Sequence, residues 1–198
     1  MKFTILTEQN YSQVISRPTP HLHRPANAEL KYHGELFYFW QWPQQLFDGS
    51  VKTFESLSRA DTVTVIALDE KQQLLVTKQR QPNTNPFIGF AGGIMDEGEQ
   101  VWSAAKRELL EETGYASDEW YFMFAASPSG KIDWVNFYLL AKNCQLKQAQ
   151  NLDAGEQIMV EKWPLDKMTE LVMRDDFRDR DFALWWLKKK ASGEEVEF

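Results

Sequence analysis

Three glutamates near the middle of the chain have the spacing of metal ligands. Glu108, Glu111 and Glu112 occupy positions i, i+3 and i+4, so a helix would carry their carboxylates on one face. A short acidic string of this kind is by itself more typical of a solvated helix surface. The three like charges repel one another, however, and a bound cation would relieve that repulsion. Because the ligands are hard oxygen atoms, we expect Mg²⁺, for which Mn²⁺ can substitute.

The residues before these glutamates could complete such a site. Arg107 lies four positions before Glu111, within reach of a charge-assisted hydrogen bond that would orient a carboxylate. Gly92 and Gly93 follow an apolar stretch, and glycine lets backbone groups approach a metal or a phosphate closely. Glu99 precedes the expected helix and would complement its positive end. These features predict a site built from a loop and a helix.

The spacing from Gly93 to Gly114 joins these features into one motif. It consists of glycine, five residues, glutamate, seven residues, arginine-glutamate-aliphatic, one residue, two glutamates, one residue and glycine. The matching residues are Gly93, Glu99, Arg107, Glu108, Leu109, Glu111, Glu112 and Gly114. This segment resembles the Nudix box and departs from it only at Tyr115, where the box prefers an aliphatic residue. At ordinary residue frequencies a chance match is on the order of one in ten million.

Resemblance to the Nudix family implies an α/β/α sandwich with a mixed sheet that hydrolyses a nucleoside diphosphate linked to another moiety. By position, Glu108 and Glu112 would be the main metal ligands, and the Gly92 carbonyl would complete the shell. Glu111 would assist in binding the metal and, with Arg107, would belong to the catalytic residues. A metal on the phosphate oxygens neutralises developing charge and orients a water for in-line attack.

A weaker likeness, over roughly residues 30 to 190, is to the ADP-ribose and nucleoside-diphosphate-sugar pyrophosphatase branch. It depends on the basic stretch Lys78 to Pro82, on Ser127-Pro128, and on an acidic loop and strand within residues 152–168. The chain departs from that branch at Gln81, usually a second arginine, and at residues 129–133. ADP-ribose, GDP-mannose and other nucleotide sugars therefore stay open as substrates.

Two further classes of function are compatible with the Nudix box. One is a Nudix hydrolase for dinucleoside polyphosphates, coenzyme A or oxidised nucleotides, which would differ in its pocket and not in its box. The other is a non-catalytic module that senses a nucleotide, although the intact set of glutamates argues against it.

The acidic loop is the expected source of the general base, since the resembled branch commonly draws its base or an extra metal ligand from there. Glu156 and Asp153 are the two candidates, and the sequence does not choose between them. A solvated acidic loop is the alternative interpretation. A positioned base would have to lie within hydrogen-bond reach of the attacking water.

Cations and aromatic residues are the candidates for substrate binding. Lys78 and Arg80 are two residues apart, so a strand would point both to one face, where they would clamp a diphosphate unless they form only a surface pair. Arg59 is a further candidate cation. Tyr38 and Trp40 lie in an aromatic run too apolar for a solvated edge. That run would either pack in the core or complete a homodimer and stack a nucleobase.

The elements that must position these residues follow from periodicity and turn signals. Residues 30–57 predict a β-hairpin or meander, and the pattern at 101–113, stopped by Gly114, predicts a helix. Further strands are expected at 62–68, 74–77, 87–91, 120–126, 134–141 and 157–163, and a second helix at 180–190. The fold class is therefore α/β, with helices packed on a mixed sheet and an N-terminal β-hairpin region.

The domain organisation is expected to be simple. Prolines at positions 18, 20 and 25 predict an irregular arm over residues 1–29, in which His21 and His23 are loop residues and not metal ligands. Residues 30–198 would form one hydrolase domain, with 30–58 as a possible dimerisation element.

Composition excludes several classes of partner. The net charge of -7 argues against binding to a nucleic-acid backbone. No run approaches the roughly 20 apolar residues that span a bilayer, and the start resembles no signal peptide. Cys144 is the only cysteine, so an intrachain disulfide is impossible. We expect a cytoplasmic protein with a small-molecule substrate, without nucleic-acid or membrane partners.

Overall fold

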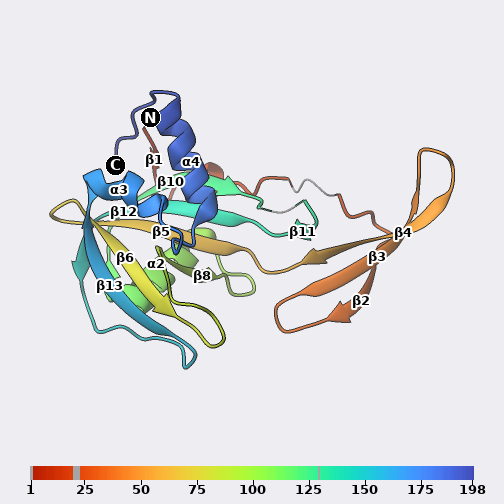
Figure 1. The fold of residues 1–198 in the computed structure, drawn as a ribbon, viewed down its shortest axis with the longest axis horizontal. Coiled ribbons are helices and arrows are strands. Elements are labelled where there is room, and N and C mark those ends of the chain that lie inside the picture. Colours follow the sequence, from red (N-terminus) through yellow and green to blue (C-terminus); the bar gives the residue numbers. More distant parts are fainter. Residues whose placement is uncertain (1, 20–22, 129) are drawn as a thin grey trace.

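The computed structural model describes residues 2–19, 23–128 and 130–198, and these form a compact body with a long projection (Figure 1). His21, expected to be a loop residue, lies outside the described residues. The body contains a nine-stranded sheet in the described part of the chain, and the projection belongs to a four-stranded sheet.

The large sheet is mixed, as predicted. Its main path runs in the order β1-β10-β12-β5-β6-β13. These strands are β1 (Thr4–Ile5), β10 (Glu119–Ala126), β12 (Asn136–Leu146), β5 (Thr62–Asp69), β6 (Gln73–Arg80) and β13 (Gln157–Pro164). β5 and β12 pair in parallel, and the other neighbours along this path pair antiparallel. β5 is almost wholly buried, and so is the first part of β12, Asn136 to Ala141, which explains the nearly continuous apolar sequences of these two stretches.

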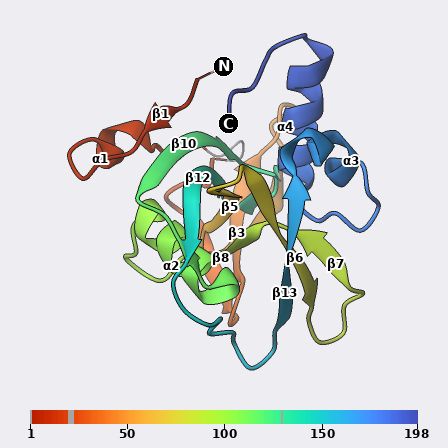
Figure 2. The same ribbon diagram turned by 90° about the vertical axis from the view of Figure 1, so that its left-hand side faces the viewer.

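Helices cover both faces of this sheet (Figure 2). Val63 and Val65 of β5 pack in one core with helix α2 (Val101–Thr113), whereas Ile66 and Leu68 pack in a second core on the opposite face. The second core includes helices α3 (Met168–Val172) and α4 (Arg180–Ala191), which follow the 3₁₀ turn η1 (Leu165–Lys167). The alternation along β5 therefore builds the expected α/β/α sandwich.

The sheet divides where β5 and β6 separate. The two strands pair only at Ala67–Leu75 and Leu68–Leu74 and then diverge. The expected strand at 87–91 is accordingly two strands, because β7 (Phe87–Gly89) follows β6 while β8 (Ala91–Ile94) follows β5. We call the opening between the β5–β8 pair and the β6–β7 pair the sheet split.

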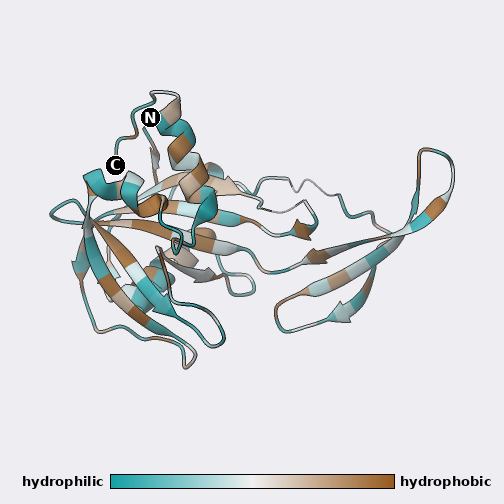
Figure 3. Cartoon of the chain, viewed as in Figure 1, coloured by the Kyte–Doolittle hydropathy of each residue, from teal (hydrophilic) through white to brown (hydrophobic). Residues whose placement is uncertain are grey.

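The projection, which we call the wing, is a meander of β2 (Glu29–His33), β3 (Tyr38–Gln45) and β4 (Val51–Ser58). The short β11 (Ile132–Asp133) joins it in parallel to β4. The N-terminal hairpin region is thus present with one strand more than a hairpin, and it extends away from the body (Figure 1). Apolar residues recur along its strands (Figure 3).

The N-terminal segment differs from the irregular arm expected for residues 1–29. It contains β1 and the one-turn helix α1 (Tyr11–Val14), and the first residue of β2 is Glu29. Leu6 is buried in the core on the α2 side, and its N–H donates to the Trp120 carbonyl at 2.8 Å. Pro18 and Pro25 lie outside helices and strands, after this segment has paired with the edge strand β10.

Two remaining features agree with the composition. Cys144 is a buried free thiol that pairs through its backbone with Asp69 of β5. Within the residues that the structure describes, no helix is both long enough and apolar enough to cross a membrane.

Candidate active site

Helix α2 has the predicted bounds, and its three glutamate side chains are buried to different degrees. Ala104, Ala105 and Leu109 anchor it against the sheet, and Gly114 ends it in the left-handed region at φ 76°. This anchoring carries Glu108 and Glu112 inward, where they are only 9% and 4% exposed. Glu111 is more exposed. Two of the three predicted metal ligands are therefore buried carboxylates.

Arg107 connects the helix to the preceding loop. Its Nε and Nη2 donate to the two carboxylate oxygens of Glu99 at 3.0 and 2.8 Å, and Nη2 also donates to the Ile94 carbonyl. Its Nη1 donates to Glu108 at 2.8 Å and to Glu111 at 3.1 Å. The predicted orienting residue thus holds two metal-ligand candidates and the loop together, using the fork of donors that only arginine provides.

The two glycines of β8 are required by close contacts. The Gly92 N–H donates to Glu112 Oε2 at 2.9 Å, and a Cβ on Gly92 would lie 2.1 Å from the Val63 carbonyl oxygen. A Cβ on Gly93 would lie 2.5 Å from Glu108 Oε1. The lack of a side chain at Gly92 therefore lets β8 lie against β5, and the lack of one at Gly93 lets Glu108 of α2 approach β8.

Burial makes these two glutamates hard to ionise. Desolvation raises the pKa of Glu108 to about 7, although Arg107 opposes the shift. Desolvation also raises the pKa of Glu112 to about 9, and the charges of Glu108 and Glu156 raise it further, against the Gly92 N–H. Both carboxyls can be ionised together near neutral pH only with a cation beside them, so these donors fit a divalent metal.

The structure does not bring these acids into a ready-formed coordination set. Across residues 2–19, 23–128 and 130–198, no three His, Cys, Asp or Glu side chains converge in a group that could hold a metal ion. Instead, Arg107 pairs with Glu108 and Glu111.

The acidic loop brings one of its two candidate bases to the glutamates. Glu156 is half-buried, and its charge contributes to the raised pKa values of both Glu108 and Glu112. Its own pKa is raised by burial first, then by Asp153 and by Glu111. Asp153 is exposed. The two candidate bases therefore differ in burial, Glu156 being half-buried and Asp153 exposed, although the sequence did not distinguish them.

The two basic residues at the end of β6 lie on one face of the sheet. Lys78 and Arg80 are both exposed and follow Leu74 and Val76 at every second position along the strand, and those two residues face the core on the α4 side. Lys78 and Arg80 are therefore both on the sheet face opposite α2. Arg80 and Glu156 line one cleft of about 390 Å³ between residues 80–84 and 154–157. The structure thus brings Arg80, but not Lys78, to the acidic loop.

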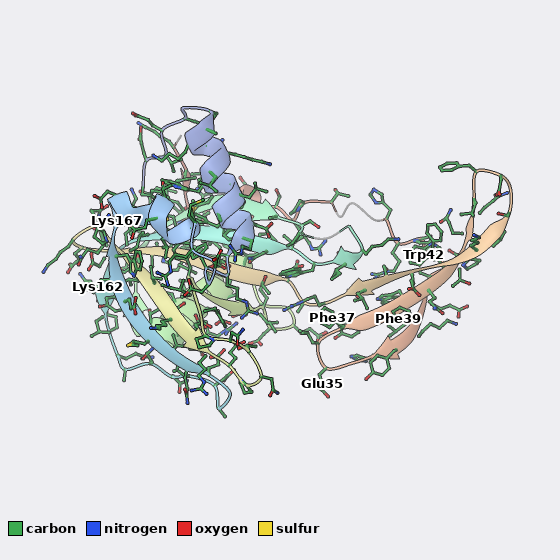
Figure 4. All side chains as sticks on the ribbon, viewed as in Figure 1. Glu35, Phe37, Phe39, Trp42, Lys162 and Lys167 are labelled. Carbon is green, nitrogen blue, oxygen red and sulfur yellow. The ribbon has the colours of Figure 1, made fainter. Side chains whose placement is uncertain are left out.

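The aromatic candidates Tyr38 and Trp40 lie on the wing. Tyr38 packs on His33 at 4.5 Å between ring centroids, and the Arg24 guanidinium lies 4.0 Å from the Trp40 ring. Figure 4 shows the neighbouring Phe37, Phe39 and Trp42 on the same projection, away from the body. Within one chain these two rings have partners of their own and do not reach α2.

Arg59 lies where the wing joins the body, directly after β4 and three residues before the start of β5. Its guanidinium carbon is 5.0 Å from the Trp134 ring centroid and 5.7 Å from that of Phe37. Sequence reasoning missed Trp134 and the loop before α4, whose Arg178 and Asp179 contact β7 and Phe90. The dense charges in residues 174–181 were the available signal.

Asp179 is a missed residue whose charge acts on one of the glutamates. Its Oδ2 accepts the Phe90 N–H at 2.8 Å, and its charge contributes to the raised pKa of Glu112. Burial raises the pKa of Asp179 itself to about 6. It therefore anchors the chain where β7 passes into β8, two residues before Gly92.

The fold, the glutamate helix and the glycines of β8 define a Nudix hydrolase. The NUDIX domain family model matches residues 58–186, and the chain belongs to this family as a Nudix pyrophosphohydrolase of nucleotide substrates. It is 22% identical to the ADP compounds hydrolase NudE of Escherichia coli (strain K12) over 170 residues, 85% of this chain and 89% of that protein. It is 24% identical to the ADP-ribose pyrophosphatase of Bacillus subtilis (strain 168) over 169 residues, 83% of this chain and 91% of the relative.

Structural similarity supports the same fold. A crystal structure of an ADP compounds hydrolase superposes with a TM-score of 0.69 at 22% identity, covering 85% of this chain and 93% of the other.

A further relative, the methanol dehydrogenase activator of Bacillus methanolicus, is 27% identical over 131 residues, 65% of this chain and 71% of that protein.

Proposed function

We propose that this protein hydrolyses the pyrophosphate bond of a nucleoside-diphosphate sugar, releasing a nucleoside monophosphate and a sugar phosphate. ADP-ribose is the first candidate and GDP-mannose a related one. The observation that carries the proposal is the pair of buried carboxylates, Glu108 and Glu112, held against the glycines of β8. The names of the two relatives that match over most of the chain support an ADP-containing substrate.

The metal in this proposal is Mg²⁺, with Mn²⁺ as a substitute. Glu108 and Glu112 would hold it, Glu111 would assist, and the Gly92 carbonyl would complete its shell. When bound, such a metal supplies charge neutralisation on the phosphate oxygens. Arg107 keeps Glu108 and Glu111 in place through its bonds to both and to Glu99.

Glu156 is the proposed general base, with Asp153 as the second candidate. A base must accept a proton from the attacking water, which requires a carboxylate that is deprotonated at the working pH and has an elevated proton affinity. Glu156 fits this role because it is half-buried beside the glutamates. Arg80 in the same cleft, and Arg59 at the root of the wing, would hold the substrate phosphates. Lys78 fits less well because it does not line the cleft that Arg80 shares with Glu156.

A hydrolysis panel tests the proposed substrate class. Purified protein is incubated with ADP-ribose, GDP-mannose, a diadenosine polyphosphate, coenzyme A and an oxidised nucleoside triphosphate, each with Mg²⁺, Mn²⁺ or EDTA. We expect metal-dependent release of AMP and ribose 5-phosphate from ADP-ribose, identified by chromatography, at the highest kcat/KM of the panel. A preference for a substrate without a sugar would support another Nudix hydrolase, and no cleavage anywhere would support a nucleotide-sensing module.

We also propose that residues 30–198 form the hydrolase domain and that the wing, residues 30–58, joins two copies into a homodimer. Large apolar side chains on the wing are exposed in the single chain, with Tyr32 at 67% and Phe47 fully exposed. Such surfaces are usually covered. A second copy is the proposed occupant, since Tyr38 and Trp40 can meet a nucleobase only if the wing reaches the partner's site.

Light scattering tests this dimer. We expect a particle of about twice the 23.1 kDa chain mass. The double variant Tyr32→Glu/Phe47→Glu should be a monomer with a raised KM, because charges would be buried at the interface. Leu184→Glu is the control, since Leu184 is 53% exposed on α4 of the body. A wild-type monomer with full activity would refute the pocket that depends on two copies.

A further inference from the structure

Two arginines from distant parts of the chain meet at the mouth of the sheet split. Arg59 directly follows β4 and lies three residues before Thr62, the first residue of β5, which pairs with β8 on one side of the split. Arg178 is on the other side, because its N–H donates to the Ile88 carbonyl of β7 at 2.8 Å. The Arg178 guanidinium carbon lies 4.4 Å from the ring centroid of Phe87, also in β7. Because β5 and β6 run antiparallel, the start of β5 near Arg59 lies at the same end of the split as the end of β6, where Arg178 donates to Gln81 at 3.5 Å.

These two guanidiniums repel each other. Burial lowers the pKa of Arg59, and the positive charge of Arg178 lowers it further. Asp61 offsets this only in part, because its carboxylate is bound by Arg17 at 2.7 and 3.0 Å. An arrangement of two close cations is unfavourable without an anion between them.

Neither arginine is neutralised within the described chain. No ion pair of Arg59 or Arg178 occurs among residues 2–19, 23–128 and 130–198. Arg178 Nη1 donates only to Gln81 Oε1 at 3.5 Å, and Arg59 Nε only to the Ala60 carbonyl at 3.3 Å. Arg107, by contrast, has four carboxylates within 4.0 Å. Most donors of the Arg59–Arg178 pair are therefore available to a ligand.

The chain connects this pair directly to the glutamate site. The segment from Phe87 beneath Arg178 runs through Phe90 to Gly92, whose N–H binds Glu112. Asp179, the residue after Arg178, accepts the Phe90 N–H along the way. A ligand that spans the split would thus meet carboxylates at one end and guanidiniums at the other.

We propose that Arg178 and Arg59 together form a phosphate-binding site, which we call the seat. It would bind the substrate phosphate that the metal does not contact. The paired forks match the oxygens of a phosphate group, and the rings of Trp134 and Phe87 hold the two guanidiniums from behind. This inference deepens the proposed function and makes Arg178 a specificity-determining residue. The seat selects ligands that carry a diphosphate over those that carry one phosphate.

Binding without turnover tests the seat separately from the reaction. Calorimetric titrations with ADP and with AMP are performed in EDTA on wild type, Arg178→Gln, Arg59→Gln and the double variant. We expect each single change to weaken ADP binding by about 10-fold to 100-fold, as the loss of charge-assisted hydrogen bonds to phosphate does. AMP binding should change by less than about 3-fold, and the double variant should lose less than the product of the single losses because both arginines bind one group.

Matched variants distinguish the loss of phosphate binding at the seat from a general defect in binding or folding. Arg174→Gln removes an exposed arginine of the same loop that is already paired with Asp176, and it should bind ADP as wild type does. Arg178→Lys keeps the charge but not the fork and should be intermediate. Thermal melting of each variant checks that it is folded.

Several outcomes would overturn the seat. These are wild-type ADP affinity in Arg178→Gln, equal losses of ADP and AMP binding, or no ADP binding to wild type. With Mg²⁺ and the substrate identified by the panel, Arg178→Gln should raise KM about 10-fold or more with kcat nearly unchanged. An unchanged KM alongside active hydrolysis rejects the seat alone, whereas Arg178-dependent ADP binding without any hydrolysis rejects the substrate assignment alone.

Discussion

Glu112→Gln is expected to lower kcat by about 10³-fold, equivalent to about 4 kcal/mol of transition-state stabilisation, because it removes a principal metal ligand. The substitution keeps the shape of the side chain, and the glutamine amide oxygen can still accept the Gly92 N–H. The loss should therefore reflect the missing charge and not a collapsed β8. Steady-state rates at saturating Mg²⁺ measure it, and the same rate in both proteins would contradict the metal assignment outright.

The same variant should be more stable than wild type when metal is removed. The pKa of Glu112 is raised from 4.5 to about 9, so ionisation favours the unfolded chain. Below its unfolded pKa of 4.5, the Glu112 carboxyl does not lower the free energy of unfolding. As pH rises from 4.5 towards 9, the carboxyl lowers that free energy progressively. At about pH 8 in EDTA we expect Glu112→Gln to raise the free energy of unfolding by up to about 5 kcal/mol, the linkage value for a pKa moved from 4.5 to about 9, with little difference near pH 4.5.

Urea denaturation across this pH range measures the effect. Glu97→Gln, an exposed loop position, is the control for the loss of one acidic charge. A Glu112→Gln protein that is less stable than wild type at every pH would indicate that the carboxylate serves only to hold the fold.

Glu156→Gln is expected to reduce kcat by about 10² or more while leaving the Mg²⁺ dependence unchanged, as removal of a positioned general base does. Burial and the neighbouring acids raise the pKa of Glu156. Wild-type activity should therefore fall as pH drops through that raised pKa, because the base becomes protonated. The residual activity of the variant should lack this dependence.

Asp153→Asn is the matched comparison for the base. Asp153 belongs to the same loop but is exposed, so we expect its amide variant to retain activity within about 3-fold. If Asp153→Asn loses more than Glu156→Gln, the base is Asp153. If Glu156→Gln instead raises the Mg²⁺ requirement at unchanged maximal rate, Glu156 acts as a metal ligand.

The parts of the fold that were predictable are those in which local signals agree with each other. Helix α2 begins at Val101 and ends at Thr113 as expected, because its apolar spacing and the left-handed Gly114 indicate the same bounds. The strands β5 and β12 were equally visible because both faces of each are buried. The glutamates could be proposed as metal ligands because the motif fixes their spacing to two glycines.

Other parts depend on tertiary neighbours that no local pattern contains. The strand expected at 87–91 divides at Phe90 because its two halves follow different partners. Arg178 was missed since its importance comes from Arg59, 119 positions earlier in the chain by their residue numbers. Glu156 and Asp153 differ only in the direction in which a loop turns, which charge and spacing do not specify.

The short parallel pairing of β11 with β4 has a consequence for protein engineering. Leu57 and Ser58 at the end of the wing pair with Ile132 and Asp133, and the Leu57 N–H donates to the Lys131 carbonyl at 3.0 Å. The wing therefore receives its fourth strand from the connection between β10 and β12 in the middle of the body. A chimera that exchanged residues 30–58 alone would separate these partners, so a graft between relatives must transfer the wing together with residues 131–133.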